Sequence, residues 1–207
     1  MENVYELVAH SAVLYCGIYN IYEKEKRILN KIVTVVNKVF PEMLADIKEN
    51  CDKIEGIVVD TYLDTIRNNM MDILDYVENI RVIGEEVVEK VLFDISSVGL
   101  VQNDDIANFE NYDEKQKKVV LNFLKATKKN SIKAFKTTYK NKEKYFHTAK
   151  ENLKNIHDAA QALINTKKVD PFVVKILDKM KVDTNELTQD IIDMGRPKEN
   201  LLKKIND

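Results

Sequence analysis

Apolar residues recur along this chain at alternating intervals of three and four residues, the spacing of a helix that packs along one side. The first such seam runs through Leu7, Ser11, Leu14, Ile18, Ile21, Glu25, Ile28, Ile32, Val35 and Val39. It predicts a helix from about Asn3 to Phe40. Pro41 suits the first turn of a following helix, where the N–H that proline lacks would have no partner in any case.

The same spacing continues after Pro41 and predicts a second helix that ends near Val98, with Gly99 as its stop signal. Its apolar positions are Leu44, Ile47, Cys51, Ile54 and Val58, and then Ile73, Val77, Ile80, Val87 and Val91. Poor helix formers lie inside it at Gly56, Asn68, Asn69 and Gly84. Because each of these lowers helix stability, the sequence allows either one long rod or two shorter helices.

A third long helix is predicted to begin after Asp113, because Asp113 and Gln116 form the sequence pattern of a capping box. We expect it to end near Lys168, since Lys167 and Lys168 suit the negative end of the helix dipole.

The remaining tail has the pattern of short helices that pack on the long ones. The pair Asp170–Pro171 is a typical helix start, and Asp183 with Glu186 forms another capping-box pattern. Gly195 is expected to stop that helix, and Pro197 to begin a last short turn.

Heptad positions divide the third helix into three faces. The seam contains Ile132, Phe135, Tyr139, Lys142, Phe146, Ala149, Leu153, Ile156, Ala160 and Leu163. A row of lysines lies beside it, and the opposite flank, from Ser131 to Ala162, is uncharged. In a two-stranded coiled coil both flanks would usually be charged. The uncharged flank therefore predicts a second neighbouring helix and a bundle of at least three helices.

Charge is unevenly distributed, although the net charge is only −2. Residues 1–114 carry 10 basic and 23 acidic side chains, whereas residues 115–154 carry 13 lysines and 2 acidic side chains. A charge block of this size needs an electrostatic partner, inside the molecule or outside it.

Seven lysines of the third helix are therefore candidates for contact with an anionic surface. They are Lys129, Lys133, Lys136, Lys140, Lys144, Lys150 and Lys154. One interpretation is that they pair with the acidic second helix. The other is that they face a membrane or a nucleic acid. The third helix has no arginine, which favours a diffuse anionic surface over recognition of bases.

The stretch from Leu7 to Tyr22 has no formally charged side chain over 16 residues. It is shorter than the ~20 residues of a membrane span, and the acidic residues before it are unlike the basic start of a signal peptide. We expect the tail to cover it. Self-association or conditional membrane insertion are the alternatives, with these candidate residues: Leu7, Val13, Leu14, Ile18 and Tyr22.

Motifs for chemistry are scarce. The chain has no glycine-rich phosphate loop and no zinc-protease motif, and two cysteines do not make a disulfide framework. Glu143, His147 and Glu151 share one helical face, but two turns of a solvated helix explain that spacing as well as a metal does. We expect no enzymatic activity, no cofactor and no metal.

The sequence predicts an all-α, elongated, coiled-coil-like bundle of three long helices over residues 1–168. Short capping helices over residues 169–207 would complete one structural unit. We expect a non-enzymatic interaction or scaffold protein that self-associates, with a cytoplasmic location that extends to the membrane periphery. A membrane-active, pore-forming-like protein that uses Leu7–Tyr22 and a nucleic-acid-binding protein are the alternatives. Its expected partner is a protein or a second copy, then an anionic membrane; nucleic acid is the least favoured.

Overall fold

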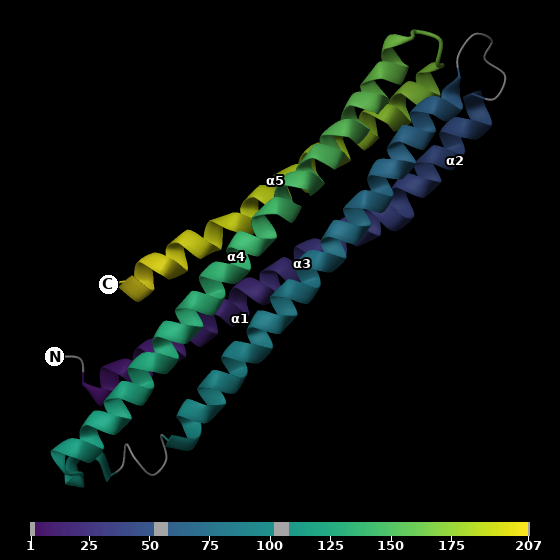
Figure 1. The fold of residues 1–207 in the computed structure, drawn as a ribbon. Helices are drawn as coiled ribbons and strands as arrows, with labels where there is room; N and C mark the ends of the chain where they lie inside the picture. The colour runs from purple at the N-terminus through teal and green to yellow at the C-terminus, as the bar shows by residue number, and fades with distance from the viewer. Residues whose placement is uncertain (1–2, 52–57, 102–107, 207) are drawn as a thin grey trace. The chain divides into compact units, whose positions relative to one another are not determined.

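The computed structural model describes residues 3–51, 58–101 and 108–206, with the backbone alone at 92–101, 196–198, 202 and 205–206. Within these ranges every regular element is a helix and none is a strand. The helices form four long runs along the chain (Figure 1). The expected all-α class is confirmed.

The first run is continuous from α1 (Val4–Thr34) through a π-helical segment η1 (Val35–Val39) to α2 (Phe40–Cys51). The predicted helix boundary at Pro41 is therefore wrong. The Phe40 N–H donates to the carbonyl oxygen of Val35, five residues earlier. In a regular helix a proline ring collides with the carbonyl four residues before it. The wider π turn lies directly before Pro41, where it gives the ring room.

The helix expected from Pro41 to Val98 is two helices. The run that contains α2 ends at Cys51, and α3 spans Val59–Val101, so α3 ends two residues beyond Gly99. Asn68, Asn69 and Gly84 lie inside α3 and do not interrupt it, whereas Gly56 falls outside the described residues.

Helix α4 spans Glu114–Asn165, after a short 3-10 helix η3 (Phe109–Asn111). The predicted capping box is confirmed. The Gln116 N–H donates to Asp113 Oδ1 at 2.8 Å, and the Asp113 N–H donates to Gln116 Oε1 at 3.1 Å. The helix ends three residues before the predicted Lys168, and the chain turns there through Lys167, whose φ is 57°.

The tail is one long helix, α5 (Pro171–Asn206), so the prediction of short capping helices is wrong. Its start is as expected, because the Val173 N–H donates to Asp170 Oδ1 at 2.9 Å. Asp183 lies within the helix and accepts a hydrogen bond from Lys179 instead of capping a new one. Buried residues continue at helical spacing past it, at Leu187, Ile191 and Met194. This packing outweighs the local stop signals, Gly195 included.

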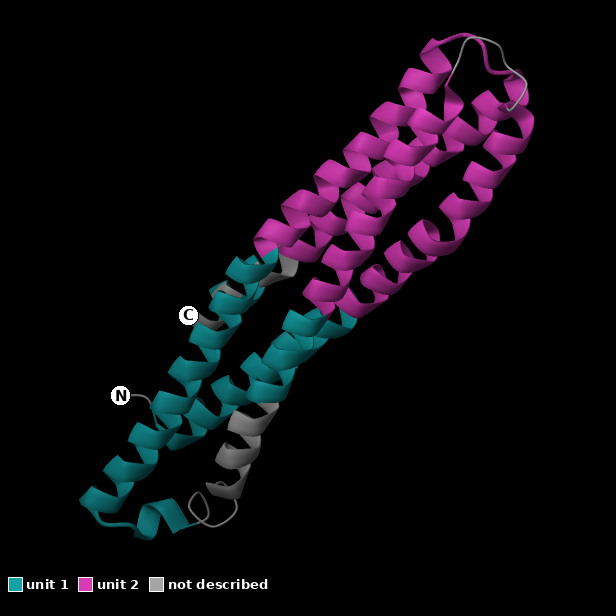
Figure 2. Cartoon of the chain, turned by 45° about the vertical axis from the view of Figure 1, so that its right-hand side comes forward, with its two compact units in different colours: residues 1–24, 82–142, 196–207 teal, residues 25–81, 143–195 magenta. Residues whose placement is uncertain are grey.

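The chain divides into two compact units (Figure 2). Unit 1 contains Met1–Lys24, Val82–Lys142 and Arg196–Asp207, and unit 2 contains Glu25–Arg81 and Glu143–Gly195. Each unit thus takes segments from α1, α3, α4 and α5. The expected division of the chain at residue 168 stays a prediction.

Unit 2 has one apolar core to which all four helical runs contribute. Its fully buried side chains include Phe40, Leu44, Ile47, Leu63, Ile66, Ile73, Leu153, Ile156, Leu163, Leu177 and Met180. On the uncharged flank of α4, Asn155 Nδ2 donates to Asn69 Oδ1 of α3 at 3.0 Å, and Tyr145 packs against Tyr76 with ring centroids 6.0 Å apart. This confirms that a second helix lies along that flank.

Unit 1 has two smaller apolar clusters. One joins α1, α3, α4 and the end of α5, with Phe135 edge-on to Tyr139 at a centroid distance of 5.0 Å. The other joins the start of α1 to η3 and α4, through Val4, Leu7, Phe109, Val120 and Leu124.

Most positions of the predicted seams are buried, polar members included, but Val58 is 70% exposed and Ile54 lies outside the described residues. Ser11, Glu25 and Lys142 lie on them and are buried. After Glu25 the buried face of α1 moves by one residue, to Leu29 and Val36 in place of Ile28 and Val35. A helix of 3.6 residues per turn drifts against a repeat of 3.5, and this drift explains the move.

Candidate functional site

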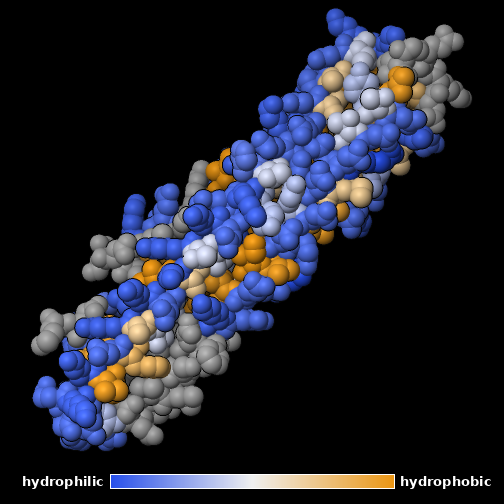
Figure 3. All heavy atoms as spheres, in the orientation of Figure 1, coloured by the Kyte–Doolittle hydropathy of each residue, from blue (hydrophilic) through white to orange (hydrophobic). Residues whose placement is uncertain are grey.

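The candidate lysines of α4 are displayed on its surface in both units. Lys129, Lys133, Lys136 and Lys140 in unit 1 are exposed; we call these four the lysine row. In unit 2, Lys144 and Lys154 are exposed and Lys150 is half-buried. Figure 3 shows that hydrophilic side chains cover most of the face in view, with apolar ones in separate small patches.

The lysine row has no carboxylate partner among the described residues: no ion pair within 4.0 Å joins any of its four ammonium groups to a described Asp or Glu. Acidic side chains of α3 pair instead with other residues, such as Glu78 with Arg81 at 2.5 Å and Asp60 with Lys48 of α2 at 3.3 Å, both in unit 2. The interpretation in which the acidic second helix neutralises these lysines therefore finds no support in the part of unit 1 that the structure describes.

The lysines of α4 in unit 2 have closer partners. Lys154 Nζ lies 3.1 Å from Asp158 Oδ2, and Lys144 Nζ lies 4.7 Å from the ring centroid of Tyr145. The hydrogen bond from Lys154, followed by that of His157, holds the pKa of Asp158 below its usual value. These contacts occupy two of the three candidate lysines in unit 2.

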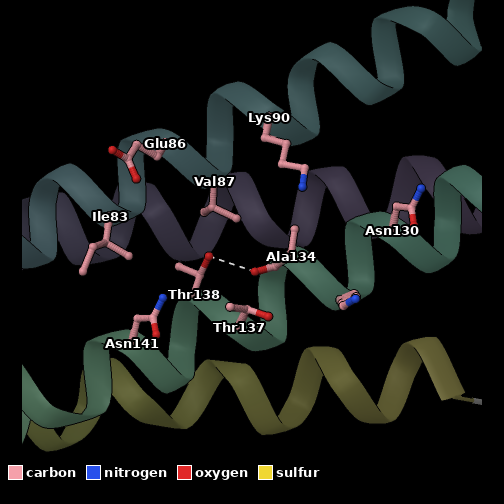
Figure 4. Close-up of a pocket in the computed structure, with 10 residues that line it drawn as sticks. Ile83, Glu86, Val87, Lys90, Asn130, Ala134, Thr137, Thr138 and Asn141 are labelled. Carbon is pink, nitrogen blue, oxygen red and sulfur yellow. Dashed lines mark hydrogen bonds between the residues drawn. The ribbon is translucent and has the colours of Figure 1, made fainter.

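A groove of about 560 Å³ lies between α3 and α4 in unit 1 (Figure 4). Ile83, Val87 and Ala134 form its apolar part, and Glu86, Lys90 and Lys133 carry charge around it. The Thr138 hydroxyl at this groove donates to the Ala134 carbonyl oxygen at 2.8 Å, so it is used within α4. A groove with this mixed apolar and charged lining suits shallow contact with a polar partner.

A smaller hollow of about 240 Å³ lies between α1 and α4 in unit 1, and we call it the lysine hollow. It is lined by Leu7 of α1 and by Lys125, Lys128, Lys129 and Ile132 of α4. Lys128 Nζ lies 3.3 Å from His10 Nδ1 of α1. Lys125 also lines a pocket of about 540 Å³ toward Val4 and Phe109. Basic side chains thus surround an apolar floor here.

The uncharged segment Leu7–Tyr22 is only partly covered. Leu7, Leu14 and Ile18 are buried, and Tyr22 is half-buried. Val13 is 48% exposed, so the expected cover of this segment is incomplete. The residue spacing alone could not show which side of it stays exposed.

The tail covers part of this segment, as expected. Leu201 of α5 packs so closely on Gly17 that a Cβ at this position would lie 2.3 Å from Leu201 Cδ1. Leu201 joins Leu14 and Ile18 in one cluster.

The helical face of Glu143, His147 and Glu151 shows one contact between neighbouring turns. His147 Nε2 lies 3.2 Å from Glu151 Oε1, an ordinary contact one turn apart. Nowhere in the described ranges do three His, Cys, Asp or Glu side chains meet as metal ligands would. Cys16 is exposed and Cys51 is buried, and the two do not form a disulfide.

Sequence reasoning missed Lys125 and Lys128 as site residues. Lys128 and Lys129 follow Lys125 by three and four residues, which was a signal that both lie beside it on one helical face. Their approach to Leu7 of α1 depends on tertiary packing and has no sequence signal.

No protein-family model, curated protein or solved structure matches this chain. No described helix combines the length and the apolar character that a membrane crossing requires. The fold and the candidate site therefore describe this protein, as an all-α protein with a basic helix face.

Proposed function

We propose that this protein is a non-enzymatic helical scaffold that docks peripherally on an anionic membrane surface from the cytoplasm. The observation that carries the proposal is the lysine row of α4, which is exposed and has no described carboxylate partner. Anionic headgroups attract basic side chains by about 1 kcal/mol per lysine near the surface. Four such lysines are enough for reversible docking.

A membrane explains the composition of this face better than a nucleic acid does. Residues 115–154 contain 13 lysines and no arginine. Arginine is preferred where planar, two-pronged hydrogen bonds read a base or clamp a phosphate, whereas lysine acts as a point charge. A diffuse layer of headgroups requires no such geometry.

The proposal includes self-association along helix faces in a coiled-coil-like manner. Large apolar or aromatic side chains on α1 are exposed in unit 1, namely Tyr5, Val13 and Tyr19. Light scattering across a concentration series measures the mass in solution, and a monomer at all concentrations contradicts this part alone.

The test of membrane docking is sedimentation with vesicles. We expect binding to vesicles that contain phosphatidylserine, little binding to phosphatidylcholine alone, and weaker binding at higher salt because screening shortens the range of charge attraction. Equal binding to both lipids, or none to either, contradicts the proposal. Retention on immobilised DNA without vesicle binding would favour the nucleic-acid alternative instead.

A matched pair of variants locates the contact. Changing Lys129, Lys133, Lys136 and Lys140 to Gln removes four charges from the lysine row. Changing the exposed lysines Lys24, Lys175, Lys203 and Lys204 to Gln removes four charges elsewhere. Only the first variant should lose most of its binding to anionic vesicles; equal losses would show that net charge, and not this face, causes the binding.

A further inference from the structure

The lysine hollow of unit 1 brings like charges together over an apolar floor. Lys125, Lys128 and Lys129 lie three and four residues apart on α4, and Leu7 of α1 is fully buried beneath them. Like charges at this spacing on a helix destabilise it by roughly 0.2–0.5 kcal/mol per pair. Neither Lys125 nor Lys129 has an ion pair with a described carboxylate. An anion in the hollow would relieve this repulsion.

The hollow is tied to α1 by a specific contact. The 3.3 Å contact between Lys128 Nζ and His10 Nδ1 holds the ammonium group at the α1 side. Val13 follows His10 by three residues, so the two share one helical side, and Val13 is among the exposed apolar residues. An exposed apolar side chain thus lies about one turn along α1 from the residue that contacts Lys128.

We infer that the lysine hollow binds the headgroup of an anionic phospholipid within a bilayer, with Val13 in contact with the lipid beside it. The inference rests on the proposed function and gives it a defined site. The lysine row begins at the hollow, since Lys129 belongs to both. A free phosphate would use the hollow alone, whereas a bilayer would also contact the rest of the lysine row and Val13.

The experiment compares two triple variants of the full chain in binding to vesicles of phosphatidylserine and phosphatidylcholine. One changes Lys125, Lys128 and Lys129 to Gln, and the other changes Lys133, Lys136 and Lys140 to Gln. Both remove three charges from the same helix in the same unit. Diffuse charge attraction predicts equal losses of affinity. If the headgroup instead accepts charge-assisted hydrogen bonds from the lysines of the hollow, the vesicle affinity of the first variant should fall about tenfold further than that of the second.

Each outcome has one meaning. Equal losses overturn the inference and leave the proposed function standing, whereas failure of the unaltered protein to bind anionic vesicles overturns both. Isothermal titration with inorganic phosphate identifies the source of the anion. Phosphate binding as tight as vesicle binding, and equally dependent on the first three lysines, would assign the hollow to a small soluble anion and overturn the lipid assignment.

A second pair of variants tests the inference independently of the lysines. Val13→Asp places a carboxylate beside the hollow and should lower vesicle affinity severalfold. Val119→Asp is the control, because Val119 is an exposed valine of α4 in the same unit that does not line the hollow. Equal effects of the two changes would contradict the role of Val13. Circular dichroism checks that both variants keep their helix content.

Discussion

The lysines of α4 have different surroundings in the two compact units. In unit 2, Lys154 pairs with Asp158 and Lys144 lies over the ring of Tyr145. Lysines on other helices of that unit also have partners, as in the 2.7 Å contact between Lys31 Nζ and Asp190 Oδ2. In unit 1 the lysine row has no described carboxylate partner. The net charge of the chain therefore says little about where free positive charge is displayed.

The units also differ in how their apolar side chains are covered. Unit 2 has one core that includes residues of all four helical runs. Unit 1 has two smaller clusters, and of the α5 residues described there only Leu201 belongs to one of them. Large apolar side chains are nevertheless exposed in both units, such as Val13 in unit 1 and Met71 and Phe172 in unit 2. Variants placed in one unit or the other test how far the two units differ.

Truncation in the core of unit 2 should have the largest effect. Phe40 is fully buried in that core, next to the π segment. Phe40→Ala should lower the free energy of unfolding by about 3–5 kcal/mol, measured by urea denaturation. Phe172→Ala is the control, because Phe172 is more than half exposed and its loss should cost little. Equal costs would contradict the burial that the fold assigns to these residues.

Neutralising lysines should affect vesicle binding in unit 1 more than in unit 2. Changing Lys133, Lys136 and Lys140 to Gln removes three exposed charges and should weaken binding to anionic vesicles by up to about 100-fold, at about 1 kcal/mol per lysine. Changing Lys144, Lys150 and Lys154 to Gln should have a much smaller effect, because partners within unit 2 already occupy two of these lysines. The same loss in both variants would remove the distinction between the units.

Two glycines, one in each unit, provide a matched comparison. Nothing lies within 4 Å of the Cβ position of Gly195, so Gly195→Ala should stabilise α5 by about 0.8–1 kcal/mol through helix propensity. At Gly17 the added methyl group would displace Leu201, so Gly17→Ala should show no such gain. Thermal unfolding measures both, and an equal gain at Gly17 would mean that α5 does not pack there.

Asn152, on the buried side of α4, tests the cost of a buried polar group. Its Nδ2 is buried and has no hydrogen-bond partner among the residues that the structure describes. Asn152→Ala should therefore raise the free energy of unfolding by about 1 kcal/mol, because an unsatisfied buried amide costs about 1–3 kcal/mol. The lost packing of the longer side chain partly offsets this gain. Asn155→Ala is the control and should destabilise, since it removes the hydrogen bond to Asn69.

The smallest expected effect is a loss of stability of unit 2 at alkaline pH. The hydrogen bond to Asp190, followed by nearby carboxylates, raises the pKa of Lys31 above its usual value. Because this pKa is higher in the folded state, the charged ammonium group stabilises the fold. The stabilisation is fully present below the unfolded pKa of about 10.4 and is lost as the pH rises through the folded pKa. Since Lys31 is nearly half exposed, the loss should be a few tenths of a kcal/mol. Urea denaturation at pH 8 and pH 11 should detect it, and Lys31→Met should abolish it.

Local signals in the sequence were reliable where packing agreed with them. Asp113 and Asp170 cap helices as their neighbours predict, and even Lys142 is buried because it lies on the predicted seam. The same kind of signal failed at Pro41 and at Gly195. A π turn accommodates the proline, and continued apolar packing carries α5 past the glycine. Propensities of a fraction to a few kcal/mol are small beside the burial of several large side chains.

By itself the sequence determined the helical class, most of the buried faces of α1, α3 and α4, and the block of lysines between residues 115 and 154. These depend on spacing along one chain segment, which a helix repeats faithfully. Only the tertiary structure decided which lysines have carboxylate partners and that Leu7 lies beneath Lys125 and Lys129. Such contacts join residues far apart in the chain, and their distances depend on how whole helices pack.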